Sequence, residues 1–244
     1  QQMVANMPLI VAMHDMPPEH IHEEIELEEL DFASYLLEWL CRPARWRDHY
    51  LALDQRPHYA YMKRVLQTLT WMRGPNRWVL KSPQHLEQLP ALLDVFPDAT
   101  IVITHRDPVS VLRSTITMLG YGDRMRRTHV DLAGLAEYWI DRVERLLAAC
   151  VRDRDTRPAA QVIDVPFHEF MADDLGMLAR IYEKAGLPLT AAARAEFDAF
   201  LAANPRGKHG QVRYDLRADF GLEPAAVRKR FGAYLARFPV RVED

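Results

Sequence analysis

Cysteine is scarce in this chain, which has 244 residues and carries cysteine at positions 41 and 150 alone. Small secreted modules that depend on disulfide bonds have several closely spaced cysteines, so this class of protein is excluded. Two distant cysteines fit a reducing compartment, and we therefore expect a cytoplasmic protein.

Long hydrophobic runs and an excess of one charge are also missing. No apolar run approaches the roughly 20 residues that a membrane-spanning helix needs, and the first apolar stretch, MVANMPLIVAM, lacks the basic leader of a signal peptide. The net charge of -3 gives no general attraction to nucleic acid or to an anionic membrane. We expect a small-molecule partner, no nucleic acid and no stable membrane insertion, and the sequence leaves assembly into a homo-oligomer open.

Lysine and serine are rare in this chain. Hydrophobic residues are not, since they make up 49% of the sequence and suffice for a full core. Arginine supplies most of the positive charge. The few lysines and serines nevertheless include a member of each basic motif described below. Lysine occurs at positions 63, 81, 184, 208 and 229, and serine at positions 34, 82, 110 and 114.

Residues 77–119 read as strand, helix, strand, helix. Residues 78–80 and 100–104 are short apolar or β-branched runs, and leucines recur at helical spacing between them. Each run is followed by a cation, Lys81 or Arg106, and then by a proline that can open a helix. Because open parallel sheets bind ligands at the carboxyl ends of their strands, this pattern predicts an α/β fold with an anion site there.

The rest of the chain is predicted to be mainly helical. A turn at residues 74–76 precedes the first strand, the run Gly120-Tyr121-Gly122 is expected to end the helix that begins at Pro108, and a third strand is expected at residues 161–165. Helices are predicted at residues 31–40, 57–73, 108–119, 132–151, 173–185, 191–202 and within 224–237.

A phosphate site is predicted where the second strand meets its helix. Asp107 is well suited to cap that helix, and Ser114 lies eight residues after Arg106. Residues seven or eight apart share a helix face, so the guanidinium and the hydroxyl can converge on one phosphate. A capped helix with a surface arginine is the alternative that these residues alone leave open.

Lys81, Ser82 and His85 form a second candidate group. Ser82 can cap the helix that Pro83 opens, which is a structural role. His85 would lie in the first turn, where the helix dipole disfavours the charged ring and keeps it able to accept a proton. Lys81 has no obvious carboxylate partner nearby in sequence, which favours a functional lysine.

A basic turn with two glycines follows much later, at Arg206-Gly207-Lys208-His209-Gly210. Its glycines allow backbone conformations that point amides at an anion, and its cations add positive charge. A solvated basic turn is the simpler interpretation when this motif is taken alone.

The three motifs, in this order, resemble the sulfotransferase family, particularly its bacterial members, which use 3'-phosphoadenosine 5'-phosphosulfate (PAPS) as donor. In that family an arginine and a serine eight residues later bind the 3'-phosphate, and Arg106 and Ser114 match. A lysine at a strand end contacts the transferring sulfuryl group, and Lys81 in WVLKSPQH is similar. A late loop closes on the 3'-phosphate, and its counterparts here are Arg206, Gly207, Lys208 and Gly210. The resemblance extends from about Met13 to the end and includes YDLRADFGL and RFGAYLARF.

The resemblance implies a three-layer α/β/α fold around a central parallel sheet, of the P-loop nucleotide-hydrolase type, with a helix-rich N-terminal part. It implies transfer of a sulfuryl group from PAPS to a hydroxyl or amine of a small-molecule, lipid or glycan acceptor, which leaves 3',5'-ADP. We expect one sulfotransferase-like domain over residues 1–244, with a helical acceptor-side region at 1–76 and, at 77–244, the sheet core and the donor-binding loop and helix.

Lys81 is the expected catalytic cation, because this transfer needs positive charge near the oxygens that gain negative charge. The transfer also needs a base for the acceptor proton. His85 and His14 are the expected catalytic residues for that role. The stretch MHDMPPEHIHEE offers further candidates, and its spacings match no standard metal site, so no metal is expected. These further candidates are His20, His22, Glu23 and Glu24.

Two features depart from the family pattern. The family opens with a strand, a PRSGTT-like loop and a helix that cradle the 5'-phosphosulfate, and no Gly-Thr or Gly-Ser loop of that kind occurs among these residues. We expect that loop to precede Gln1 in the natural protein. Phe167 stands where the family often has tyrosine, so a hydroxyl contact is absent there or comes from another residue.

Two other functions stay open at this point. One is a non-catalytic protein that binds a 3',5'-ADP-type nucleotide or a partner without the phosphate loop. The residues upstream of Gln1 distinguish it from the enzyme, because a PRSGTT-like loop there supports catalysis. The other, a relative of ATP-dependent P-loop kinases, is disfavoured because no GxxxxGK[ST] pattern occurs.

Overall fold

The computed structural model describes residues 6–14, 22–75, 77–156, 158–210 and 212–243. The chain divides into two compact units. Unit 1 comprises residues 1–18, 100–144 and 157–244, and unit 2 comprises residues 19–99 and 145–156. The expectation of one domain over residues 1–244 stays a prediction.

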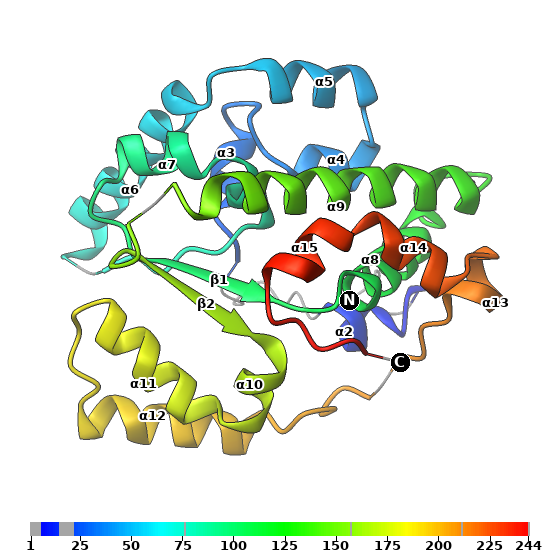
Figure 1. Ribbon diagram of the computed structural model, residues 1–244. Coiled ribbons are helices and arrows are strands. Elements are labelled where there is room, and N and C mark those ends of the chain that lie inside the picture. The colour runs from blue at the N-terminus through cyan, green and yellow to red at the C-terminus, as the bar shows by residue number, and fades with distance from the viewer. Residues whose placement is uncertain (1–5, 15–21, 76, 157, 211, 244) are drawn as a thin grey trace. The chain divides into compact units, whose positions relative to one another are not determined.

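Unit 1 contains a two-stranded parallel sheet made of β1 (Ile101–His105) and β2 (Val162–Pro166) (Figure 1). Ile101 pairs with Val162 at one end of the sheet, and His105 pairs with Pro166 at the other. Both strands are rich in β-branched residues, which suit a pleated and buried surface. The strands predicted at 100–104 and 161–165 are therefore confirmed, each displaced by one residue.

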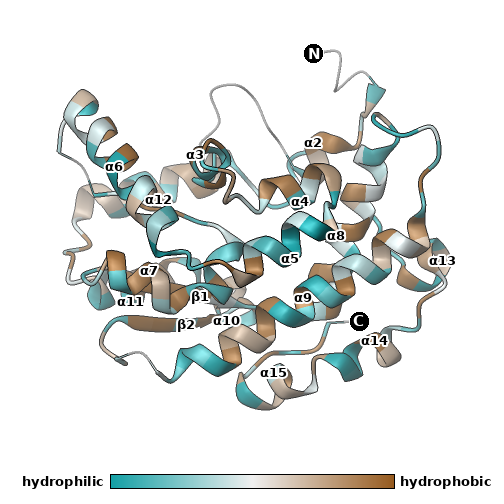
Figure 2. Cartoon of the chain, turned by 90° about the horizontal axis from the view of Figure 1, so that it is seen from above, coloured by the Kyte–Doolittle hydropathy of each residue, from teal (hydrophilic) through white to brown (hydrophobic). Residues whose placement is uncertain are grey.

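Helices cover β2, which Figure 2 draws mainly in the hydrophobic colour. Both α10 (Phe167–Ala172) and α11 (Asp174–Lys184) contact this strand. Met177 of α11 joins Ile163 and Val165 in a buried cluster, which removes apolar surface from water and stabilises the unit. Besides α8 and α9, the helices of this unit include α2 (Ile10–Met13), α12 (Ala191–Ala203), α13 (Leu216–Phe220), α14 (Pro224–Arg230) and α15 (Gly232–Arg237).

The helix after β1 is longer than the sequence indicated. α8 (Pro108–Asp123) runs through the glycines that were expected to end it, so that prediction is wrong. Gly120 is buried, and a Cβ atom there would lie 3.1 Å from the side chain of Leu132, on α9 (Leu132–Arg154). Gly120 therefore permits a close approach between helices instead of breaking one.

His105 connects the end of β1 to the last helix. The residue is 1% exposed, and its ring stacks on Phe238 with 4.1 Å between the ring centres. Its Nδ1 lies 2.9 Å from the Tyr234 hydroxyl, and its Nε2 lies 2.9 Å from Oδ1 of Asp164. Because every polar atom of the ring has a partner, this buried network fixes α15 at the strand end.

Unit 2 is helical. The helix predicted at 57–73 is confirmed as α6 (Arg56–Arg73), which ends at Gly74 with φ +91. The prediction at 31–40 is right for its second part only, because Phe32 adopts a positive φ and the helix starts later. The other helices that lie wholly within this unit are α3 (Ile25–Glu29), α4 (Leu36–Cys41), α5 (Ala44–Ala52), the 3₁₀ helix η1 (Pro83–Glu87) and α7 (Leu89–Val95).

The strand predicted at residues 78–80 is wrong. Residues 77–82 have no regular secondary structure, and Val79 is 91% exposed. Side chains anchor this segment in place of a strand ladder, since the Trp78 indole donates a hydrogen bond to Oγ1 of Thr70 at 2.9 Å. Lys81 therefore does not end a strand.

Several smaller predictions also have outcomes. The helices predicted at 132–151, 173–185 and 191–202 are confirmed as α9, α11 and α12, whereas the single helix expected within 224–237 is two helices, α14 and α15. The turn predicted at 74–76 includes Asn76, which lies outside the described residues. In the described ranges, no helix is both long enough and apolar enough to cross a membrane.

A buried glutamate on α3 makes stability depend on pH. Burial, followed by the negative charge of Glu24, raises the pKa of Glu28 from 4.5 to about 8. Between these values the folded protein keeps a proton that the unfolded chain releases, so stability falls as pH rises from about 4.5 to about 8.

We expect Glu28→Gln to remove this pH dependence, because glutamine has a similar shape and no proton to lose. The free energy of unfolding at pH 8 should rise by on the order of a few kcal/mol, and at pH 5 by much less. Urea denaturation of both proteins at the two pH values measures this. An equal change at both values would show that Glu28 does not titrate as described.

Candidate functional site

Arg106 follows β1 directly and holds a carboxylate. Its Nε and Nη2 each donate to one carboxylate oxygen of Glu243, both at 2.7 Å, which is the fork geometry with which arginine binds planar anions. Its guanidinium carbon lies 4.1 Å from the ring centre of Phe167. The hydrogen-bonded Glu243 raises the pKa of Arg106 although burial opposes this. An anionic group thus occupies the fork at the carboxyl end of a strand.

Asp107, the next residue, anchors the same C-terminal segment. Its Oδ1 accepts a hydrogen bond from the Val109 backbone at 3.1 Å, which confirms it as the cap of α8. Its Oδ2 accepts from the Arg228 guanidinium at 2.8 Å and from the backbone N–H of Glu243 at 3.0 Å. Because Asp107 is fully buried, these bonds hold Glu243 firmly beside the fork.

Ser114 lies on α8, two turns after the cap, and is half-buried. Within the part of the chain that the structure describes, its hydroxyl has no hydrogen-bond partner. It can therefore donate to or accept from a ligand without losing an existing contact.

The basic turn at residues 206–210 is exposed and lies between α12 and α13. Gly207 and Gly210 have φ values of +77 and +91, as the glycines of a tight turn would. Arg206 donates to both carboxylate oxygens of Asp174, at 2.8 and 3.0 Å, and to the Met171 carbonyl at 3.1 Å. Like Arg106, Arg206 is therefore engaged with a carboxylate.

Two further contacts involve the segment between α12 and α13. Lys208 donates to Oδ1 of Asn204 at 3.2 Å, within the turn itself. Tyr214, further along the same connection, lies close enough to Arg106 to be a lesser contributor to its raised pKa. The segment that carries the basic turn thus approaches the fork at Tyr214.

In unit 2, Lys81 and His85 gather around two adjacent glutamates. The Lys81 ammonium forms an ion pair with Glu23, and the Lys81 side chain is still 73% exposed. Oε2 of Glu24 accepts the Lys81 backbone N–H at 2.7 Å, and its Oε1 lies 2.6 Å from Nε2 of His85. Both glutamates are distant in sequence from residue 81. For that reason, the sequence pattern did not identify them as its partners.

Both ring nitrogens of His85 are engaged. Its Nδ1 lies 2.8 Å from the hydroxyl of Tyr59, and its Nε2 faces Glu24. Burial works against ionisation of Glu24, but the hydrogen bond and charge of His85, with backbone hydrogen bonds, lower its pKa overall. An ionised carboxylate can only accept a hydrogen bond, so Nε2 of His85 carries the proton. Ser82 caps η1 by accepting the Gln84 N–H at 3.3 Å, as predicted.

The remaining histidine candidates for the base come from different parts of the chain. His14 directly follows α2 in unit 1 and is half-buried, whereas His22 belongs to unit 2 and pairs with Glu26 at 3.0 Å. His20 lies outside the described residues. No group of three or more histidines, cysteines, aspartates or glutamates in the described ranges is arranged to hold a metal ion.

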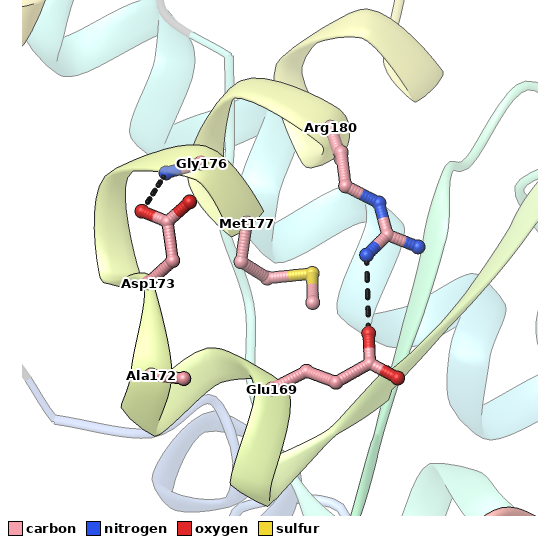
Figure 3. Close-up of a pocket in the computed structure, with 6 residues that line it drawn as sticks. All are labelled: Glu169, Ala172, Asp173, Gly176, Met177 and Arg180. Atoms are coloured by element: carbon pink, nitrogen blue, oxygen red, sulfur yellow. Dashed lines mark hydrogen bonds and ion pairs between the residues drawn. The ribbon is translucent and has the colours of Figure 1, made fainter.

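A groove beside α10 and the start of α11 involves none of the residues predicted for the site (Figure 3). Across it, Arg180 donates to Glu169 at 3.2 Å, and Asp173 accepts the Gly176 N–H at 2.8 Å. These polar groups are hydrogen-bonded to one another, so we assign the groove a structural role and not a ligand-binding one. The groove is lined by Glu169, Ala172, Asp173, Gly176, Met177 and Arg180.

Two solved structures are similar to this chain over nearly its whole length. Sulfotransferase STF9 from Mycobacterium avium is 25% identical with a TM-score of 0.81, and the match covers 98% of this chain and 64% of that one. Sulfotransferase STF1 from Mycobacterium tuberculosis H37Rv is 27% identical with a TM-score of 0.75, and the match covers 94% of this chain and 61% of that one. The chain thus spans less than two thirds of either protein.

The other comparisons concern families and curated proteins. No curated protein matches the chain. The helix-rich structure with its small parallel sheet and the two structural matches support the predicted fold class, the P-loop-like α/β fold of sulfotransferases. The model of the sulfotransferase family matches residues 1–191, which is well over half of the sequence. The chain therefore belongs to the sulfotransferase family.

Proposed function

We propose that the protein transfers a sulfuryl group from PAPS to a hydroxyl or amine of a small-molecule, lipid or glycan acceptor. One observation carries this proposal: Arg106, at the end of β1, holds an anion in a two-bond fork. A phosphate, like a carboxylate, can offer two oxygens to one guanidinium, so the fork suits the 3'-phosphate that distinguishes PAPS from ordinary adenine nucleotides. Membership of the family supports the class of reaction.

In this proposal, two side chains and the basic turn at residues 206–210 bind the donor phosphate. Arg106 takes two phosphate oxygens, and the unengaged hydroxyl of Ser114 takes a third, because arginine is only a donor and serine can serve either way. The exposed turn adds positive charge and backbone amides. It contributes Arg206, Gly207, Lys208 and Gly210.

The reaction moves one group and one proton. The acceptor oxygen or nitrogen forms a bond to sulfur, while the bond between sulfur and the 5'-phosphate oxygen breaks and 3',5'-ADP leaves. Lys81, whose side chain is largely exposed, stabilises the negative charge that develops on the oxygens. His85 or His14 accepts the acceptor proton. On His85 only Nδ1 can accept it, and the acceptor group then takes the place of the Tyr59 hydroxyl at that nitrogen. We also propose a cytoplasmic location, since Cys41 and Cys150 are both free thiols.

A transfer assay tests the function. The full-length natural protein is incubated with PAPS labelled on its sulfur and a panel of hydroxyl and amine acceptors. We expect label to appear on an acceptor together with an equal amount of 3',5'-ADP. Binding of 3',5'-ADP without any transfer would instead favour the non-catalytic alternative.

Glu243 should compete with the donor, because its carboxylate occupies the fork that the phosphate needs. Glu243→Gln removes this charge, and we expect 3',5'-ADP to bind about twofold to fivefold more tightly, the size of a partly exposed ion pair. Isothermal titration calorimetry measures the change. The matched control is Glu169→Gln, which removes the ion pair with Arg180 (Figure 3) and should leave affinity unchanged. Weaker binding to Glu243→Gln than to the wild type would count against a phosphate at Arg106.

A further inference from the structure

Glu24 connects the two residues proposed for catalysis in unit 2. Its carboxylate is 1% exposed and uses both oxygens, one for the Lys81 backbone at 2.7 Å and one for the His85 ring at 2.6 Å. Residues 81 and 85 lie far from residue 24 in sequence. One buried carboxylate therefore fixes the main chain of the first and the ring of the second at the same time.

The contact also fixes the state of the ring. Glu24 is ionised, so the proton of His85 sits on Nε2 and points at Glu24. When the ring is neutral, Nδ1 is its acceptor nitrogen, and the hydroxyl of Tyr59, a residue that is 2% exposed, lies 2.8 Å away and donates to it. A ring held from both sides has one orientation and one tautomer.

The ammonium of Lys81 and its backbone N–H have different partners. The ammonium pairs with Glu23 and stays largely exposed, so a substrate oxygen can reach it. Glu24 holds the chain from which this flexible side chain extends. The two neighbouring glutamates thus contact different parts of Lys81, since Glu23 pairs with the exposed ammonium and Glu24 accepts the backbone N–H.

We propose that Glu24 is a positioning residue, whose bridging carboxylate holds Lys81 and His85 in the arrangement that sulfuryl transfer requires. This inference rests on the proposed function and assigns to that reaction a residue that touches neither donor nor acceptor. Small errors in the placement of reacting groups are costly, and a displacement of about 1 Å can lower a rate about 100-fold.

A purely structural role is the alternative that the test must separate. The chain contains a second cluster of the same types, His105 with Asp164 and Tyr234, which is buried and connects β1 to α15. Such a network can stabilise a fold without any part in chemistry. A loss of stability alone therefore does not distinguish the two roles, and the test needs readouts that report on His85 and on turnover separately.

Glu24→Gln is the informative variant. Its amide oxygen can still accept the Lys81 N–H, but the neutral amide removes the negative charge that holds the proton on Nε2 of His85. We expect kcat to fall about 100-fold with little change in KM for PAPS. Long-range ¹H–¹⁵N NMR should show His85 as the Nε2–H tautomer in the wild type and as a mixture in the variant.

Glu28→Gln is the matched control, because it makes the same substitution at a buried glutamate one helical turn further on. Rates are expressed per folded protein, and this control should keep the wild-type kcat and the wild-type His85 spectrum. Equal loss of kcat in both variants, or no loss in Glu24→Gln, would overturn the proposal.

The two proposals can fail separately. If the full-length wild-type protein transfers no sulfuryl group to any acceptor, the proposed function fails. The NMR comparison still tests whether Glu24 fixes the tautomer of His85. An unchanged His85 tautomer in Glu24→Gln would then overturn the positioning role, whereas a lost tautomer would support it.

Discussion

Replacing Lys81 by alanine is expected to lower kcat about 100- to 1,000-fold in the full-length protein, while the affinity for 3',5'-ADP stays close to that of the wild type. The ammonium is proposed to act on the sulfuryl group, where negative charge develops in the transition state, and removing one such donor typically has an effect of this size. The product 3',5'-ADP lacks the sulfuryl group, so its binding should not depend on Lys81.

Steady-state kinetics and calorimetry on the same preparation separate the two effects. Lys184→Ala is the control, because Lys184 only donates to the Ala159 carbonyl at 3.0 Å and lies outside the proposed site. It should match the wild type in both measurements. A large loss of 3',5'-ADP affinity with normal turnover in Lys81→Ala would reject the assigned role.

Replacing Arg106 by alanine should weaken the binding of 3',5'-ADP by at least tenfold and by up to about 100-fold. Charge-assisted hydrogen bonds contribute about 1.5–3 kcal/mol each, and we reduce their sum because the guanidinium is partly exposed. Binding of 5'-AMP, which has no 3'-phosphate, should change little. The contrast between the two nucleotides therefore matters more than either value alone.

The same titrations with Arg217→Ala provide a control, since Arg217 pairs with Glu223 on an exposed surface. That variant should bind both nucleotides like the wild type. If Arg106→Ala weakened 3',5'-ADP and 5'-AMP equally, the 3'-phosphate would not be the group that Arg106 binds. A folding defect would be recognised by a lower melting temperature and a reduced fraction of binding-competent protein.

Features that depend on local chemistry could be predicted from the sequence. Asp107 and Ser82 cap their helices as expected, because a cap needs only a short polar side chain and the next two or three amides. The glycines at 207 and 210 adopt positive φ, and periodicity indicated the long helices correctly. The cation after β1 likewise follows from a pattern that spans a few residues.

Features that depend on distant partners could not be predicted. Residues 78–80 have the composition of a strand, but a strand forms only with a neighbour, and side-chain contacts anchor this segment instead. Gly120 reads as a helix breaker until the close side chain of Leu132 is known. Both errors arise because tertiary packing overrides local preference.

In the candidate site, too, local features could be predicted from the sequence and contacts between distant residues could not. Arg106 and Lys81 could be selected by their type and their place before a helix. Their carboxylate partners could not, because Glu243 lies 137 positions from Arg106 and Glu24 lies 57 positions from Lys81. No spacing rule relates residues so far apart. Glu24 was a candidate base by its sequence, and its contacts with Lys81 and His85 emerge only from the fold.

A crystal structure of the full-length protein with 3',5'-ADP tests the central claim most directly. We predict that the 3'-phosphate replaces the Glu243 carboxylate on Nε and Nη2 of Arg106 and receives a hydrogen bond from the Ser114 hydroxyl. A nucleotide bound elsewhere, with the ion pair between Arg106 and Glu243 intact, would contradict the account.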